Sequence, residues 1–348
     1  MPPPVVGQAG MPTGFRIPVQ NATGNESCVG VCRTNVPGIG ERFWISAGAI
    51  SPTPGLPHKL YVFNRLGTLL GSFDQPTTFS ASNLVGLRDL TSDGTYLYGG
   101  QEGNTVRAFN TVTNTWAPAM NITLVAPPIA IVTALTFLPA TDTFLCSDGG
   151  PLLREFNRAG VFIAPPRPVP AATTIAGAAF DAMSGNIFLH TQTSFVRPGI
   201  TSVFYRHDLA TGFNGGEVSY GDLAINAGGG QAGGLDMYVV AGRQRGVFMS
   251  QANAAGSTDE VVEIYADFSY GPTCPIGPAP VRMDFAGGAP YAGNSTFTLG
   301  FTTPPGWAGG LAFFLFSATE APPLPLPFLF TTARAVCRCI RSSPARRS

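Results

Sequence analysis

The sequence contains few charged residues and few histidines. Asp, Glu, Lys and Arg make up 11% of the 348 residues, whereas about a quarter is usual for a globular domain. Twenty basic residues balance twenty acidic ones, so no long-range field favours nucleic acid or an anionic membrane surface. Only three histidines are present, and histidine is the usual general base of an enzyme. The composition therefore gives no support to nucleic-acid binding and little to acid–base catalysis.

Long apolar runs and helical patterns are also missing. No stretch approaches the roughly 20 apolar residues with which a helix crosses a bilayer. Residues 1–15 lack the basic start and apolar core of a signal peptide. If the protein is exported, we expect its leader to have been removed or to lie upstream. Amphipathic spacing of the helical kind is not found over any useful length, so the sequence does not predict a helical fold.

What the sequence does contain is glycine, proline and short apolar runs. It has 43 Gly and 32 Pro, and 44% of its residues are hydrophobic. A chain with this much apolar content can build a core and is not disordered. Frequent turn formers between short apolar runs indicate many short strands, so we predict an all-β fold.

One strand pattern occurs five times. Short alternating runs end in a polar residue in "LYVFN", "VRAFN", "LREFN", "FYRHD" and "EIYAD", and the final residues are Asn64, Asn110, Asn157, Asp208 and Asp267. Their spacings are 46, 47, 51 and 59 residues. Turn formers follow the first four copies, and "FNRLG" and "FNRAG" repeat almost letter for letter. Asn and Asp side chains at these points can cap the turns.

The runs around each copy complete a four-stranded unit. A second strand precedes every copy, as in "TYLYGGQ", and a third precedes that one in four of the five units, as in "GLRDLTSDG". Four antiparallel strands repeated about every 45 residues are typical of a β-propeller blade. The first unit lacks an obvious innermost strand and the last lacks an obvious outermost one. We therefore expect the two ends of the repeat region to complete each other and close a ring of five blades, with a degenerate sixth blade as the alternative.

The pattern changes after Tyr270. The Pro- and Gly-rich stretch "YGPTCPIGPAP" follows, and the later strands have a different spacing. The predicted organisation has four parts: an N-terminal extension (1–27), a β-propeller (28–270), a small β-sandwich-like domain (271–340) and a basic tail (341–348).

These repeats resemble a known group of proteins. "GLRDLTSDGTYLYGG" followed by "NTVRAFN" is similar to the blades of secreted bacterial β-propellers of the YVTN/NHL-like or streptogramin-lyase-like kind. The C-terminal "GNSTFTLGFTTPPGW" region resembles a small domain found at the ends of exported bacterial proteins. The resemblance implies a secreted or cell-surface protein. It implies structure more than activity.

Six cysteines suit an exported protein with disulfides, although six allow fifteen pairings. Cys146 lies in an apolar run and is expected to be a buried thiol. The neighbourhood of the others contains no histidine that would indicate a zinc site, and no metal site is predicted. The disulfide candidates are Cys28, Cys32, Cys274, Cys337 and Cys339.

Four ionisable residues lie on or next to predicted innermost strands, where propellers usually bind ligands. They are Arg88, Asp89, Asp181 and Asp236. An Arg beside carboxylates at a narrow channel could bind a polar ligand such as a sugar or a carboxylate. The competing hypothesis, which we favour, is that Arg88 and Asp89 join neighbouring blades through buried hydrogen bonds. No catalytic residue and no cofactor are assigned.

The sequence thus predicts an exported propeller that acts as a non-enzymatic binding or structural module. Its partners would be protein or carbohydrate at the cell surface, and self-assembly stays open. The alternative is a propeller enzyme, a lyase, lactonase or glycosidase, acting through the axial channel. An enzyme of this kind requires at least two ionisable groups that converge on one end of the channel.

Overall fold

The structure is a computed structural model that describes residues 12–266 with gaps, and four short strands further along the chain. The gaps fall at 52, 81–82, 126–128, 170–173, 193–201, 210–211, 213, 220–229, 241–242 and 253–257. The chain divides into two compact units, Met1–Ala266 and Asp267–Ser348. Each unit is described by itself.

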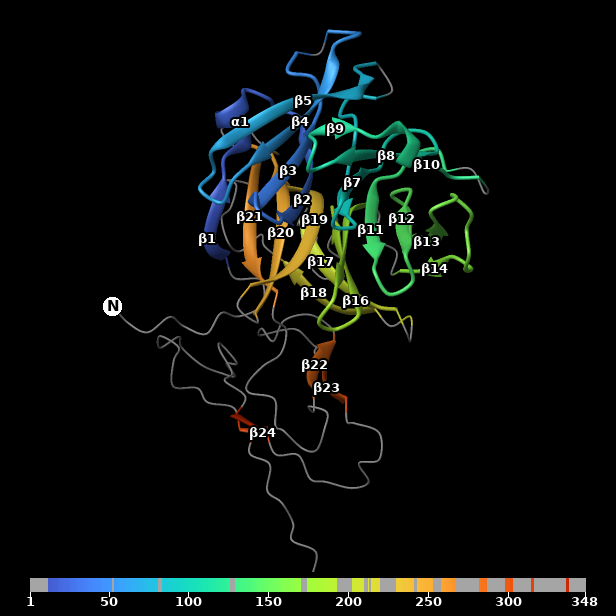
Figure 1. Ribbon diagram of the computed structural model, residues 1–348. Coiled ribbons are helices and arrows are strands. Elements are labelled where there is room, and N and C mark those ends of the chain that lie inside the picture. The colour runs from blue at the N-terminus through green and yellow to red at the C-terminus, as the bar shows by residue number, and fades with distance from the viewer. Residues whose placement is uncertain are drawn as a thin grey trace, which may run out of the picture. The chain divides into compact units, whose positions relative to one another are not determined.

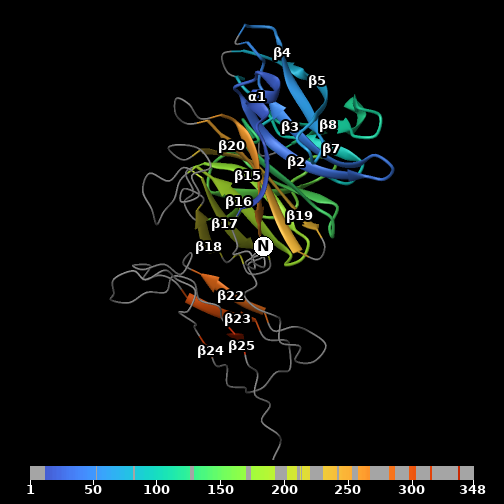
Figure 2. The ribbon, with the colours of Figure 1, turned by 90° about the vertical axis from the view of Figure 1, so that its left-hand side faces the viewer.

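The first unit contains five antiparallel sheets, numbered here in chain order (Figures 1 and 2). The first consists of β2 (Cys28–Val36), β3 (Gly40–Ala47), β4 (Pro57–Phe63) and β5 (Leu69–Thr78). The second consists of β6 (Leu90–Ser92), β7 (Tyr96–Gly99), β8 (Thr105–Asn110) and β10 (Ile122–Thr123), with β9 (Thr115–Trp116) also paired to β8. The short 3-10 helix η1 (Pro118–Met120) precedes β10.

The other three sheets follow the same plan. The third consists of β11 (Ala134–Leu138), β12 (Thr143–Ser147), β13 (Leu152–Asn157) and β14 (Arg167–Pro168). The fourth consists of β15 (Ile175–Asp181), β16 (Asn186–Thr191), β17 (Val203–Asp208) and β18 (Asn214–Ser219). The fifth consists of β19 (Gln231–Val240), β20 (Arg243–Gln251), β21 (Glu260–Tyr265) and β1 (Pro12–Ile17).

The five sheets form a closed ring. Each innermost strand contacts the innermost strands of the two neighbouring sheets, in the cyclic order β2, β6, β11, β15, β19 and back to β2. A single four-stranded sheet cannot bury both of its faces, so the blades bury them against one another. The protein is a five-bladed β-propeller, as the repeat predicted.

The ring closes through the N-terminal strand. In the fifth sheet β1 pairs antiparallel with β21 as the outermost strand, beside which it lies in Figure 1. The short helix α1 (Val19–Thr23) then leads into β2. Completion of the last blade by the other end of the repeat region is therefore correct. The expectation that the first unit lacks an innermost strand is wrong, because β2 fills that place.

The repeated polar residues end equivalent strands. Asn64 follows β4, while Asn110, Asn157 and Asp208 are the last residues of the third strands of their sheets. The side-chain oxygen of Asn64 accepts the backbone N–H groups of Leu66 and Thr68, both at 2.9 Å. Local capping of this kind explains why the pattern is visible in the sequence. Asp267 lies outside the described residues.

The outermost strands of the second and third sheets are irregular. The run "TWAPAM" begins with β9, which pairs with β8, and the run "VFIAP" makes a single bridge between Phe162 and Phe156 of β13. The strands that complete the ladders are β10 and β14. Both are only two residues long. Such short edge pairs leave little periodic signal in the sequence.

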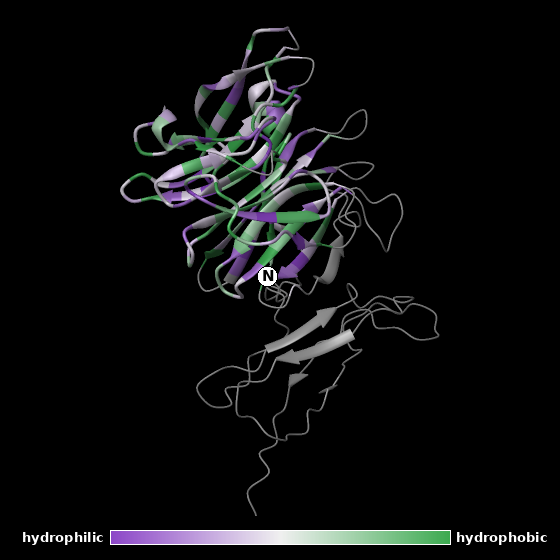
Figure 3. Cartoon of the chain, turned by 90° about the vertical axis from the view of Figure 1, so that its right-hand side faces the viewer, coloured by the Kyte–Doolittle hydropathy of each residue, from purple (hydrophilic) through white to green (hydrophobic). Residues whose placement is uncertain are grey.

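The core lies between the blades rather than in one central place. Buried apolar side chains gather in separate clusters at the seams between neighbouring sheets, and Figure 3 shows hydrophobic residues along the strands. Cys28, Phe43 and Val247 belong to the seam between the fifth and first sheets. Trp44, Leu60 and Phe109 belong to the next seam.

In the second unit the structure describes two strand pairs. One joins β22 (Arg282–Ala286) to β23 (Thr298–Thr302), and the other joins β24 (Phe314–Leu315) to β25 (Val336–Cys337). The rest of the predicted sandwich-like domain and the tail lie outside the described residues. Among the described helices, none has the length and apolar character needed to span a membrane.

Candidate functional site at the propeller axis

Asp89 lies where the innermost strands meet, and it is fully buried. Its carboxylate accepts backbone N–H groups from four of the five blades. Leu90 donates at 3.0 Å from the second sheet, Leu135 at 2.9 Å from the third, Ala178 at 2.9 Å from the fourth and Leu235 at 3.3 Å from the fifth. Burial raises the pKa of Asp89 well above its usual range, and these four bonds oppose the rise. One side chain thus holds four blades together.

Small residues make room for this carboxylate. The positions equivalent to Asp89 on the other innermost strands are Gly30, Ala134, Gly177 and Gly234. A methyl group on Gly234 would come within 2.7 Å of Asp89 Oδ1, and one on Gly177 within 2.6 Å of the Leu235 nitrogen. Larger side chains would force the strands apart. At this level the strand backbones and one carboxylate fill the axis.

Two residues further along, a second belt of bonds joins neighbouring blades. The Thr91 hydroxyl oxygen accepts the N–H of Phe137 at 3.0 Å, and that of Thr136 accepts the N–H of Phe180 at 2.9 Å. Asp236 accepts the N–H of Arg33 at 2.7 Å. Asp236 is among the candidates selected from the sequence, whereas the two threonines were missed. Their spacing of 45 residues, one repeat length, was the signal that could have found them.

The structure places the predicted ligand-binding residues in different settings. Asp89 and Asp236 come close together, since Asp89 bonds to Leu235, the neighbour of Asp236. Asp181 is buried at the end of β15 and caps the following turn, where it accepts the N–H groups of Met183 at 2.8 Å and Ser184 at 3.1 Å. It does not join the other two at the axis.

Arg88 is the one member of the set with a partly exposed side chain next to an acid. Its Nη2 lies 3.6 Å from Glu102 Oε1, and the two side chains are 29% and 24% exposed. The Arg88 N–H donates to the Gly100 carbonyl at 2.7 Å, which ties this residue to the second strand of its own blade. This Arg–Glu pair can offer a donor and an acceptor to a polar ligand.

His190 and Ser202 form a buried pair that sequence reasoning did not connect. The Gly233 carbonyl lies 2.9 Å from His190 Nδ1 and can only accept, so Nδ1 carries the proton and Nε2 accepts from the Ser202 hydroxyl at 2.8 Å. This geometry matches a nucleophile and its base. Burial lowers the pKa of His190 to about 3, however, so the imidazole is a weak base. Both side chains are buried, and we assign the pair to packing between the fourth and fifth sheets.

The cysteines of the first unit are not cross-linked. Cys28, Cys32 and Cys146 are buried free thiols, which corrects the assignment of Cys28 and Cys32 as disulfide candidates. A bulge in β2 between Cys28 and Gly30 shifts the register. As a result Cys28 joins the cluster between the fifth and first sheets, and Cys32 the cluster between the first and second. Residues four apart on a strand are also about 13 Å apart, too far for a disulfide.

The other three disulfide candidates, Cys274, Cys337 and Cys339, cannot be placed in this way. Cys274 and Cys339 lie outside the described residues, and only the backbone of Cys337 is described, in β25. Within the part of the chain that the structure describes, no group of three or more His, Cys, Asp or Glu side chains is arranged to hold a metal ion.

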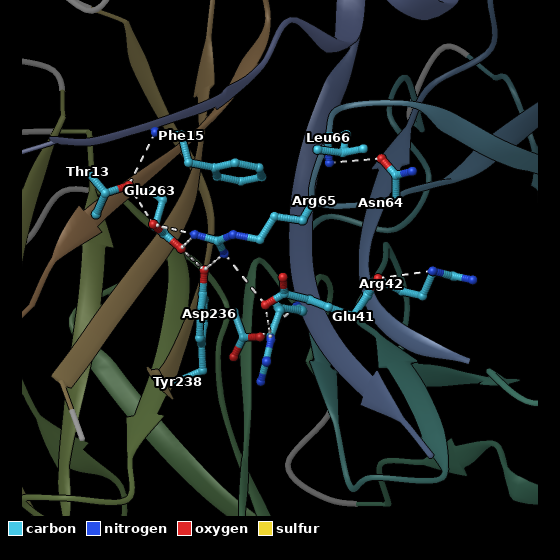
Figure 4. Close-up of polar contacts among 11 residues, drawn as sticks. Thr13, Phe15, Glu41, Arg42, Asn64, Arg65, Leu66, Asp236, Tyr238 and Glu263 are labelled. Carbon is cyan, nitrogen blue, oxygen red and sulfur yellow. Dashed lines mark hydrogen bonds and ion pairs between the residues drawn. The ribbon is translucent and has the colours of Figure 1, made fainter. Parts of the chain in front are cut away.

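The repeated Phe-Asn-Arg motif fastens blades together from the side. Arg65, in "FNRLG", reaches across the closing seam to Glu263 Oε1 at 2.7 Å and to the Tyr238 hydroxyl at 3.3 Å (Figure 4). Glu263 is fully buried, and Thr13 of β1 also donates to it. The guanidinium lies 4.6 Å from the ring centre of Phe15, likewise on β1. Arg65 therefore holds both the fifth blade and the strand that completes it.

Arg158, in "FNRAG", does the same between the second and third sheets. It donates to the Tyr98 hydroxyl at 2.8 Å and pairs with Asp93 at 3.0 Å and Asp142 at 2.7 Å. Its guanidinium lies 5.6 Å from the ring centre of Phe144. The motif visible in the sequence thus corresponds to a clamp between blades, with a tyrosine and an acid on the far side in both cases.

Comparisons with known proteins identify no family for this chain. No protein-family model matches the chain, and no curated protein matches it. Among solved structures, the crystal structure of Myxococcus xanthus glutaminyl cyclase is similar, with 15% identity and a TM-score of 0.48 over 72% of this chain and 95% of that chain. A likeness at this level carries no argument about substrate or catalysis.

Proposed function

We propose that this propeller is a non-enzymatic binding or structural module that acts outside the cell or at its surface. The proposal rests on the hydrogen bonds that the carboxylates of Asp89 and Asp236 accept. Asp89 accepts four backbone bonds, and Asp236 bonds across a seam. Carboxylates engaged in this way are not free to act as general acids or bases. The axis thus serves cohesion, which suits a rigid body that presents its loops.

The partners that fit this proposal are proteins or carbohydrates at the cell surface, including further copies of the chain. The balance of twenty basic and twenty acidic residues leaves little repulsion between copies. The partly exposed Arg88–Glu102 pair suits a neutral polar ligand, such as a sugar, better than a strongly charged one.

Two sets of measurements on the full chain, of binding and of turnover, test the proposal. Analytical ultracentrifugation over a range of concentrations and a glycan array measure self-association and carbohydrate binding. Parallel assays with lactones, p-nitrophenyl glycosides and acidic polysaccharides measure lactonase, glycosidase and lyase turnover. We expect saturable binding or concentration-dependent assembly without turnover. Turnover that Arg88→Ala abolishes would overturn the proposal and favour an enzyme acting at the axis.

The extracellular location rests on the resemblance to secreted bacterial propellers. Protease treatment of intact cells, followed by detection of the chain with an antibody, tests it. We expect loss of the full-length band on intact cells. Protection until the cells are lysed would place the protein inside and remove this part of the proposal.

A further inference from the structure

The second belt of bonds around the axis differs from blade to blade in one respect. One position in each of the five innermost strands takes part in this belt. It comes directly before the residue whose N–H faces the preceding blade. The residues at this position are Cys32, Thr91, Thr136, Ala179 and Asp236. Thr91 and Thr136 accept their cross-blade bonds with neutral hydroxyl groups. Asp236 is the only carboxylate in the belt. A hydroxyl does not titrate in the physiological range, whereas a carboxyl can.

The Asp236 carboxylate serves two backbone groups at once. Oδ2 accepts the Arg33 N–H at 2.7 Å from the first sheet, and Oδ1 accepts the Met237 N–H at 2.8 Å from its own strand. In the fourth sheet Ala179 occupies the belt position, and its side chain has no acceptor for the Met237 N–H. Asp236 therefore accepts two N–H groups, that of Arg33 in the next blade and that of Met237 in its own strand.

Asp236 also stands at the seam that closes the ring. The fifth and first sheets meet there, and the fifth is completed by β1, a strand from before the first blade. Figure 4 shows Asp236 near the Arg65, Tyr238 and Glu263 network of the same seam. The strength of the Asp236 bond thus bears on the closure of the propeller.

The charged and titratable groups around Asp236 come from several neighbouring strands. Their positions follow from the pairing of β19 with β20 and from the contacts of the innermost strands. They are Cys32 and Arg33 on β2, Asp89 before β6, Arg245 on β20 opposite Tyr238, and Tyr238 itself on β19.

Burial and the neighbouring groups act on the pKa of Asp236 in opposite directions, and together they favour the protonated acid. Burial raises the pKa of Asp236 to about 6, and the bonds from Arg33, Met237 and Cys32 and the charge of Arg33 only partly offset this. A carboxyl whose pKa is higher in the folded state than in the unfolded chain favours the folded state at low pH. That contribution is complete below the unfolded pKa of about 4 and is lost as the pH rises through about 6.

We propose that Asp236 makes the ring-closing seam sensitive to pH, so that it is tighter in mild acid than at neutral or alkaline pH, whereas the cross-blade bonds to the Thr91 and Thr136 hydroxyl groups do not titrate. The structure supports this through one carboxyl in a belt of uncharged positions, placed at the seam where the ends of the propeller meet.

Hydrogen exchange of single amides in the full chain tests the proposal. The Arg33 amide reports on the closing seam, and the Phe137 and Phe180 amides report on the two seams with hydroxyl acceptors. Each rate is divided by its intrinsic rate at the same pH to give a protection factor. Between pH 5 and pH 8 we expect the protection of Arg33 to fall about tenfold, the effect of one pKa unit. The acceptors of the other two amides do not titrate, so any change in their protection measures Asp89, which bonds to Leu135 and Ala178 beside them.

Two variants exchange the acceptor chemistry between seams. Asp236→Thr copies the second and third blades, and it should keep the Arg33 bond and make the protection of Arg33 independent of pH. Thr136→Asp should transfer the pH response to Phe180. If Thr136→Asp does not fold, Asp236→Thr alone decides. Equal protection of Arg33 at both pH values in the unmodified chain would overturn the proposal, and so would an unchanged pH response in Asp236→Thr.

Discussion

Asp89 accepts the backbone N–H of Ala178 at 2.9 Å, although the two residues belong to the second and fourth blades. The contact crosses the axis of the propeller. Three further amides bond to the same carboxylate, one from each of three blades. A ring of thin sheets has no single core, and here a polar group at the centre supplies part of the cohesion that a core gives to other folds.

Removal of this carboxylate should be costly. Asp89→Ala leaves four buried N–H groups without their acceptor, and each such group costs about 1–3 kcal/mol. We expect the free energy of unfolding in urea to fall by about 4 kcal/mol or more. Asp89→Asn should lose less, because the amide oxygen keeps part of the bonding. Glu26 is exposed, so Glu26→Gln is the matched control and should change the free energy of unfolding little. A small effect of Asp89→Ala would mean that water replaces the carboxylate at the axis.

The two Phe-Asn-Arg-x-Gly turns provide a matched pair of glycines. Gly67 and Gly160 have φ values of +76° and +77°, which disfavour any side chain. An added Cβ on Gly67 meets nothing within 4 Å, whereas one on Gly160 would lie 1.8 Å from the Thr123 carbonyl oxygen. Gly67→Ala should lose about 1 kcal/mol of stability from backbone strain alone. Gly160→Ala should lose at least about 2 kcal/mol more, because the second and third blades must separate.

Urea unfolding of both glycine variants checks this difference. The variants share sequence context and backbone conformation, so the difference isolates the contact between blades. Equal losses would show that the approach of Gly160 to Thr123 does not limit the packing of these blades.

The clamp of Arg158 should couple more strongly to Tyr98 than to Asp142. Tyr98 is fully buried, whereas the Asp142 side chain is 62% exposed and its ion pair is screened by water. A double-mutant cycle with Arg158→Ala and Tyr98→Phe should give a coupling of about 1–2 kcal/mol. The cycle with Asp142→Asn should give a smaller coupling that 0.5 M NaCl reduces further. The reverse order would place the strength of the clamp at the surface.

His190 should make the propeller sensitive to acid. Its pKa is lowered by burial to about 3, from an unfolded value of about 6.5. A histidine with a lowered pKa contributes stability above its unfolded pKa, and this contribution is lost as the pH falls below about 6.5. In His190→Gln that loss is absent. The difference in Tm between the unmodified chain and His190→Gln should therefore shrink between pH 7 and pH 4. A constant difference would contradict the burial of a neutral imidazole.

Much of the fold was visible in the sequence because its determinants are local. The turns after Asn64 and Asn157 are capped by those side chains, and the residues involved are close in sequence. The lengths of the strands and their alternation of apolar and polar residues are likewise set by residues close in sequence. The period of the repeat then predicted blades, and the need to bury both faces of each predicted a ring. The two-residue strands β10 and β14 were missed, because pairs so short carry no period.

The roles of the axial residues were decided only by the tertiary structure. The sequence marked Asp89 and Asp236 as ionisable residues on innermost strands, and it favoured joining of blades over binding for Asp89. It could not show which amides they meet, because Leu135, Ala178 and Arg33 come from other blades and reach the axis only when the ring closes. The bulge that separates Cys28 from Cys32 was hidden for the same reason. Short-range chemistry specified the blades, and contacts between distant segments specified what holds them together.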